Sequence, residues 1–171
     1  MNKSYKILLA FVVAGLVLLL FSTKIVLLVT GNALEKKQID TTITSPDLHY
    51  HIDIISPPEG LLRSVFIRGW AFDTKYQADT KRQITMILKS DTFAYEIPTF
   101  SESREDVRDA FPRYALTAND LGFGGTFSSI AIQEGKYELF LKVGEVGAEP
   151  ALLKTNKTFI KEGVRFEEVL P

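Results

Sequence analysis

The chain has 171 residues, with 20 lysines and arginines against 21 aspartates and glutamates, a formal net charge of −1 and a hydrophobic fraction of 46%. The near-neutral charge argues against a nucleic-acid-binding protein, which usually carries a basic excess or patch. The absence of cysteine excludes disulfides, thiol catalysis and thiolate metal sites.

The first 31 residues differ from the rest of the chain in composition. Residues 7–31 read ILLAFVVAGLVLLLFSTKIVLLVTG, with Lys24 as their single charge, and residues 1–31 carry three lysines and no acid. The other 140 residues hold 17 basic and 21 acidic side chains, a net charge of −4. About 20 apolar residues are needed to cross a bilayer. We therefore expect residues 7–29 to lie in the lipid bilayer as a single transmembrane helix.

We interpret residues 1–31 as a cytoplasmic tip and an uncleaved transmembrane signal-anchor, because the apolar stretch exceeds the length of a usual signal peptide. Lys3 and Lys6 favour a cytoplasmic N-terminus, which places the following domain outside the cell membrane. The alternative is a cleaved and secreted form, because the residues up to Ala33 offer a small-x-small cleavage pattern. Residues 32–47 are polar and Thr-rich, and we expect them to form a stalk.

From residue 48 the hydrophobic pattern has a period of two, which is typical of β-strands. The expected strands cover residues 49–54, 63–72, 83–89, 92–97, 122–127, 137–143 and 152–160. The run at 63–72 is apolar on both faces, which indicates a central strand. The two strands before Pro98 are expected to pair as a hairpin with a short turn at Ser90 and Asp91.

Residues 99–121 interrupt this rhythm and are expected to form a long crossover with one short helix. Ser103 followed by Asp106 resembles a capping box, and Val107 and Phe111 recur at helical spacing. The whole pattern predicts an all-β, immunoglobulin-like antiparallel β-sandwich with this one crossover helix, preceded by a single N-terminal transmembrane helix. The sandwich is expected over residues 48–161, with a C-terminal tail at 162–171.

Four short signatures occur in order along this domain: Gly69-Trp70-Ala71-Phe72-Asp73, Arg104-Glu105-Asp106-Val107, Gly122-Phe123 and Gly135-Lys136-Tyr137-Glu138-Leu139. Their order resembles the small immunoglobulin-like β-sandwich accessory modules of bacterial envelope and surface-polysaccharide proteins, some of which are attached to glycosyltransferases. The resemblance covers about residues 52–160. It implies an accessory module and supplies no catalytic residues to carry over. The resemblance does not specify one function, because such sandwiches host many functions. The chain departs from that family by its apolar N-terminal segment, and we expect no enzyme domain within these 171 residues.

Aromatic side chains are the first candidates for a binding site. Trp70 is the only tryptophan; we expect it to anchor the core, with stacking on a sugar as the alternative. Tyr76, Tyr95 and Tyr114 would form a sugar-binding platform only if their rings were exposed and coplanar.

Charged side chains around the expected helix are the second set of candidates. Arg104 and Asp106 are expected to fix the crossover to the sandwich through a charged hydrogen bond and a helix cap, with ligand binding as the alternative. Arg104, Arg108 and Arg113 would suit an anionic glycopolymer. Asp106 and Asp109 interleave with these arginines, which favours a neutralised surface.

Catalytic and metal-binding patterns are sparse. His49, His51 and Asp53 would share one face of a strand and are candidate metal ligands, but further ligands would have to come from elsewhere, and we expect a solvent-facing polar edge instead. The chain has neither a G-x-S-x-G nor an H-E-x-x-H motif. We therefore expect no enzyme activity, no metal and no cofactor.

These observations lead us to expect a membrane-anchored, extracytoplasmic, non-catalytic interaction module of the bacterial cell envelope. Its expected partners are a membrane or envelope protein or an envelope glycopolymer, with no nucleic acid. A carbohydrate-binding module is the alternative, and a hydrolase is a more distant one. The candidate binding residues are Trp70, Tyr76, Tyr95, Arg104, Asp106 and Arg108.

Overall fold

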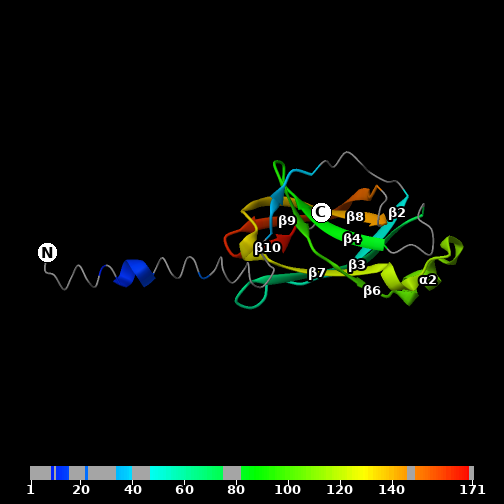
Figure 1. The fold of residues 1–171 in the computed structure, drawn as a ribbon, viewed down its shortest axis with the longest axis horizontal. Coiled ribbons are helices and arrows are strands. Elements are labelled where there is room, and N and C mark those ends of the chain that lie inside the picture. Colours follow the sequence, from blue (N-terminus) through cyan, green and yellow to red (C-terminus); the bar gives the residue numbers. More distant parts are fainter. Residues whose placement is uncertain are drawn as a thin grey trace. The chain divides into compact units, whose positions relative to one another are not determined.

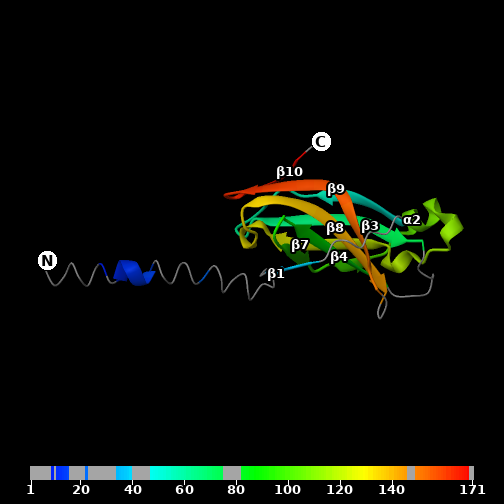
Figure 2. The same cartoon turned by 90° about the horizontal axis from the view of Figure 1, so that it is seen from above.

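We describe the fold from a computed structural model (Figures 1 and 2). The structure describes residues 9, 11–15, 22, 34–39, 47–74, 82–145 and 149–169. The chain divides into two compact units, Met1–Ala33 and Leu34–Pro171, which we treat separately.

The described residues of the first unit, at positions 9, 11–15 and 22, are all helical. Among the residues that the structure describes, no helix has the length and apolar character needed to span a membrane. Most of the expected transmembrane segment, residues 7–29, lies outside the described residues.

The second unit is all-β and consists of two antiparallel sheets. The six-stranded sheet has the order β1-β5-β4-β8-β9-β10, and the four-stranded sheet has the order β2-β3-β7-β6. The strands of the larger sheet are β1 (Lys36–Lys37), β4 (Arg82–Lys89), β5 (Ala94–Ile97), β8 (Gly135–Glu145), β9 (Ala151–Glu162) and β10 (Arg165–Glu168). Those of the smaller sheet are β2 (Leu48–Ile55), β3 (Ser64–Asp73), β6 (Phe100–Glu102) and β7 (Gly122–Ser128). This arrangement confirms the expected β-sandwich character.

The core lies between the two sheets because each strand points alternate side chains inward. On β3 the inward side chains of Val65, Ile67 and Ala71 are fully buried. The aromatic residues buried in the central cluster are Tyr95, Phe123, Phe127, Tyr137, Phe159 and Phe166. The hydroxyl groups of Tyr95 and Tyr137 form hydrogen bonds with the backbone of Gln133. The Tyr95 oxygen accepts from the Gln133 N–H at 3.2 Å, and the Tyr137 hydroxyl donates to the Gln133 carbonyl at 2.8 Å.

The strand expectations for β2, β3, β4, β5, β7, β8 and β9 are confirmed to within a few residues. β3 lies between β2 and β7, as its two apolar faces indicated. The β4–β5 hairpin closes through Ser90, whose N–H donates to the Phe93 carbonyl at 2.9 Å and whose Oγ accepts from the Phe93 N–H at 3.2 Å.

Three short strands lie where no strand pattern was evident in the sequence. β1 falls in the segment expected to be a stalk and pairs with β5 through Lys36 opposite Tyr95. Leu34 packs against the central core and Ile39 against a smaller outer cluster, so residues 34–39 belong to the sandwich. β6 falls in the expected crossover and β10 in the expected tail. These strands are two to four residues long, too short to show a periodic pattern.

Between β6 and β7 the chain forms α2 (Glu105–Ala110), followed by the 3-10 helices η1 (Pro112–Tyr114) and η2 (Ala118–Asp120). The single short helix is therefore confirmed. The expected capping box is wrong, because the N-cap position belongs to Arg104 and no side chain caps the helix. The Arg104 N–H instead donates to the Ala118 carbonyl at 2.9 Å, which ties the start of α2 to η2.

Candidate functional site

The candidate site is an aromatic surface at the end of the four-stranded sheet that α2 covers. We define this aromatic surface by five rings: His49, Trp70, Phe72, Phe111 and Tyr114. β3 supplies two of them on its outward face, β2 supplies one, and the crossover supplies the last two. Figure 1 shows α2 at one end of the sandwich.

Strand register brings the first three rings together. His49 lies opposite Phe72, and His51 lies opposite Trp70. The His49 and Phe72 rings stack with centroids 5.0 Å apart, and the Trp70 and Phe72 rings stack at 5.9 Å. His51 lies farther out, with its ring 6.3 Å from that of Trp70.

The crossover folds over these rings and completes a second small core. Phe72 becomes fully buried, together with Val107, Leu116 and Leu121. The Phe111 ring meets Phe72 edge-on at 5.2 Å. Burial of this apolar surface holds the short α2 in place, because a helix of this length is not stable by itself.

The rim of the aromatic surface stays open to solvent. Trp70, Phe111 and Tyr114 are each half-buried, so their rings belong partly to the small core and partly to the molecular surface. The guanidinium of Arg113 lies over the Tyr114 ring, 4.6 Å from its centroid. Partly exposed aromatic rings with an adjacent guanidinium offer both stacking and hydrogen bonding to a ligand.

Arg104 links the crossover to the edge strand β2. Its Nε and Nη2 donate to the two carboxylate oxygens of Asp106 at 2.9 and 2.7 Å, and its Nη1 donates to Asp53 at 2.5 Å. The hydrogen bonds from Arg104 lower the pKa of Asp106 to about 2. The pairing with Asp106 and Asp53 raises the pKa of Arg104, against the opposing effect of partial burial.

Because Gly122 has no side chain, the Arg104 side chain can lie directly against its backbone. A Cβ at Gly122 would lie 2.8 Å from Cγ of Arg104 and 3.0 Å from the carbonyl oxygen of Glu102, closer than real Cβ contacts. The Arg104 side chain is only 13% exposed. The expected role of Arg104 and Asp106 in fixing the crossover therefore agrees with the geometry, apart from the absent helix cap.

The other sequence candidates fall in different places. Tyr95 is 1% exposed in the central core, so it does not meet the condition of exposure that a platform of three tyrosines would require. Tyr76 lies outside the described residues. Arg108 is exposed and pairs with the adjacent Asp109 at 2.9 Å, which makes it a neutralised surface residue.

The histidine candidates do not gather around a common point. His51 Nε2 lies 4.0 Å from Asp53 Oδ1, while the His49 ring is stacked on Phe72. In the part of the chain that the structure describes, no group of three or more His, Asp and Glu side chains is placed to hold a metal ion. Phe111 is the site residue whose role the sequence analysis missed: its helical spacing predicted a buried helix face but not contact with Trp70 and His49.

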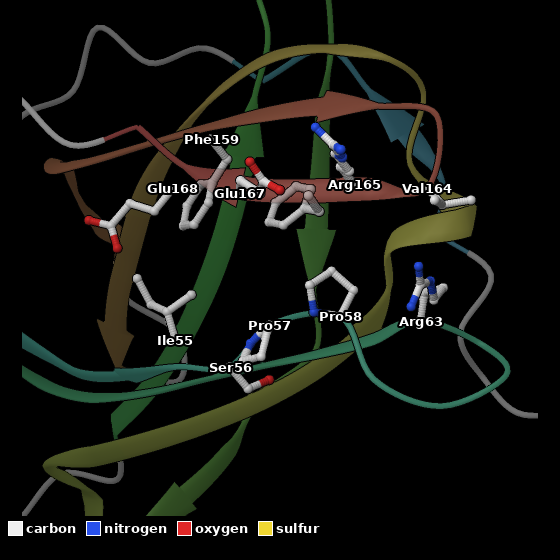
Figure 3. A pocket seen from close by; sticks show the side chains of 11 residues that line it. Ile55, Ser56, Pro57, Pro58, Arg63, Phe159, Val164, Arg165, Glu167 and Glu168 are labelled. Atoms are coloured by element: carbon white, nitrogen blue, oxygen red, sulfur yellow. The ribbon is translucent and has the colours of Figure 1, made fainter.

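A hollow lies at the other end of the sandwich, between the end of β2 and the edge strand β10 (Figure 3). This edge pocket has a volume of about 380 Å³. Figure 3 shows Phe159 on one side and Ile55 and Pro58 on the other. Its charged lining residues are Arg63, Arg165, Glu167 and Glu168, and Glu168 pairs with Lys157 at 2.7 Å.

Comparisons with known proteins identify no family. No protein-family model matches the chain, and no curated protein matches it. Among solved structures, the chain is similar to a DUF4426 family protein from Pseudomonas aeruginosa, with 13% sequence identity over 75% of this chain and 99% of that chain and a TM-score of 0.39.

Proposed function

We propose that this chain is a non-catalytic binding module of the bacterial cell envelope, anchored in the cytoplasmic membrane by residues 7–29, with its sandwich outside. The apolar composition of that segment and the helical state of its described residues support the anchor. The acidic, cysteine-free remainder of the chain is compatible with an exported domain.

We also propose that the sandwich is immunoglobulin-like and related to the accessory modules that its signatures resemble. Each signature stands at a defined point of the fold. Gly69–Asp73 ends β3, Arg104–Val107 begins α2, Gly122-Phe123 begins β7 and Gly135–Leu139 begins β8. This order of strand end, helix turn, strand and strand is the one that the resemblance implies.

The aromatic surface is the proposed binding site, and a glycan is its proposed ligand. The observation that carries this proposal is the group of partly exposed rings, Trp70, Phe111 and Tyr114, with Arg113 over the last of them. Flat apolar ring faces suit the C–H faces of a sugar, and the guanidinium suits its oxygens. The charges around the rings are mostly paired in the structure, so both neutral and anionic glycans remain candidates.

The single tryptophan makes this proposal directly testable. Full-length protein in detergent is titrated with dextran, a neutral polysaccharide, and with alginate, an anionic one, and Trp70 fluorescence is followed. We expect a blue shift and saturation with at least one of them, because a glycan would displace water from the exposed edge of the indole. Tyr114→Ala should weaken binding roughly fivefold, corresponding to the loss of about 1 kcal/mol from one aromatic contact.

Phe100→Ala is the matched control. Phe100 is a half-exposed ring on the same sheet and stacks on Phe66 at 6.4 Å, outside the aromatic surface. This variant should bind as the wild type does. Equal losses in both variants, or no fluorescence change with either polysaccharide, would refute the glycan site. A protein that co-purifies through this surface instead would indicate a protein partner.

A further inference from the structure

Three neighbouring loops carry exposed aliphatic side chains at the end of the sandwich that holds the edge pocket. We call this end, defined by Leu61, Ile130 and Val164, the aliphatic tip. Leu61 in the β2–β3 loop is 94% exposed, Val164 in the β9–β10 turn is 59% exposed, and Ile130 in the 3-10 helix η3 (Ser129–Ala131) is 41% exposed. Turns usually carry polar residues, Gly or Pro. Single exposed aliphatic side chains are ordinary on a protein surface, whereas a contiguous group of them marks an interaction site.

Hydrogen bonds and a shared pocket join the three loops. The Ser129 N–H donates to the Arg63 carbonyl at 3.0 Å, and the Ser128 hydroxyl donates to the Leu62 carbonyl at 2.5 Å, which tie η3 to the β2–β3 loop. Arg63 and Val164 both line the edge pocket, and Figure 3 shows them facing each other across it. The aliphatic tip is therefore one region of the surface.

The length of chain before the sandwich limits how far this domain can stand from a bilayer. Leu34 already packs against the core, and β1 begins at Lys36. If the anchor ends near Val29, as in the proposed function on which this inference rests, five Cα–Cα steps connect them. Fully extended, these steps reach about 17 Å, of which the headgroup layer takes roughly 5–8 Å. A sandwich with a radius of gyration of about 14 Å must then lie against the membrane.

The geometry points to the aliphatic tip as the face that touches the membrane: we propose that Leu61, Ile130 and Val164 insert into the headgroup layer of the bilayer. Both views place β1 nearer to the β9–β10 end of the sandwich than to α2 (Figures 1 and 2). The chain thus enters the domain on the side of this tip.

Charge around the tip defines the kind of lipid surface. The described residues of the tip carry no excess of cationic side chains: Arg63 and Arg165 stand beside the edge pocket with Glu167 and Glu168, and Lys161 and Glu134 both bind the backbone of Gly163. Contact therefore depends on apolar insertion and requires no anionic lipid, and the arginine stems can extend toward the headgroups. In this orientation the aromatic surface, at the opposite end, faces away from the membrane and is free to bind a ligand.

The absence of cysteine allows a site-specific test on the full-length protein. Leu61→Cys, Val164→Cys and, as the matched control, Asp109→Cys are labelled with a nitroxide and reconstituted into phosphatidylcholine vesicles. Asp109 is an exposed residue of α2. Flotation of the vesicles with the protein shows whether the chain is anchored. The rates at which each nitroxide collides with oxygen, which enters the bilayer, and with a water-soluble nickel chelate together show how deep that label lies. Trp70 fluorescence checks that each variant is folded.

We expect the protein to float, with the labels at 61 and 164 at least threefold more accessible to oxygen relative to nickel than the label at 109. If the protein floats but all three labels are as accessible to the nickel chelate as a label in water, the membrane contact of the tip is refuted while the proposed anchor is supported. A label at 109 as shielded as the others would also refute this orientation. Failure to float overturns the anchor and, with it, the contact.

Discussion

Phe72 is the residue on which the aromatic surface depends most, and Phe72→Ala tests that dependence. The side chain is fully buried, although it points away from the main core. Four rings surround it, with centroids 5.0 Å (His49), 5.2 Å (Phe111), 5.6 Å (Tyr114) and 5.9 Å (Trp70) away. Its removal leaves those rings without their common partner.

The expected cost follows from burial. Removing a buried phenylalanine costs about 3–5 kcal/mol, less where the site can collapse. The crossover that covers Phe72 is a short helix and two 3-10 turns, which can move inward, so we expect a loss of about 3 kcal/mol from the free energy of unfolding. This corresponds to a fall of roughly 10 °C in melting temperature for a domain of this size.

Urea unfolding, followed by circular dichroism and Trp70 fluorescence, measures this loss. Phe100→Ala is the control, because its ring is half-exposed and should cost about 1 kcal/mol or less. The folded-state fluorescence of Phe72→Ala should also shift to the red as water reaches Trp70. A loss no larger than that of Phe100→Ala, with unchanged fluorescence, would show that the aromatic cluster does not hold the crossover on the sheet.

Two further predictions concern the Arg104 network and the tight contact between the sheets. The pKa of Asp106 lies near 2, below its usual 3.8, so its charged form stabilises the fold above about pH 4 and this contribution is lost as the pH falls toward 2. In urea unfolding from pH 6 to 2, Asp106→Asn should be less stable at pH 6, and the difference should vanish near pH 2; a constant difference contradicts the pairing with Arg104. Gly125→Ala would place a Cβ 2.4 Å from Met86 Cε and 3.0 Å from the Pro98 carbonyl oxygen. Since the backbone oxygen cannot move freely, we expect a loss of about 1–3 kcal/mol in thermal unfolding, and a wild-type melting temperature would count against the close sheet packing.

Local patterns were sufficient to predict most of the fold. Alternation identified every strand of seven or more residues, and the two apolar faces of β3 correctly indicated a central strand, because both faces of β3 are covered for part of their length. The short helix was also correct, since Val107 is its buried residue. β1, β6 and β10 were missed because strands this short are selected by a neighbouring edge and not by their own periodicity. β5 is equally short, but its hairpin turn after β4 identified it.

The sequence by itself determined which side chains alternate inward, where the crossover interrupts the strands, and that the first 31 residues have the composition of a membrane anchor. Only the tertiary structure decided which aromatic residues meet. Tyr95 was a surface candidate in the sequence and is a core residue in the fold, whereas Phe111 and Tyr114 reach Trp70 and His49 from more than 40 positions away. Such contacts arise from strand register and from the path of the crossover, which depend on how the whole chain packs.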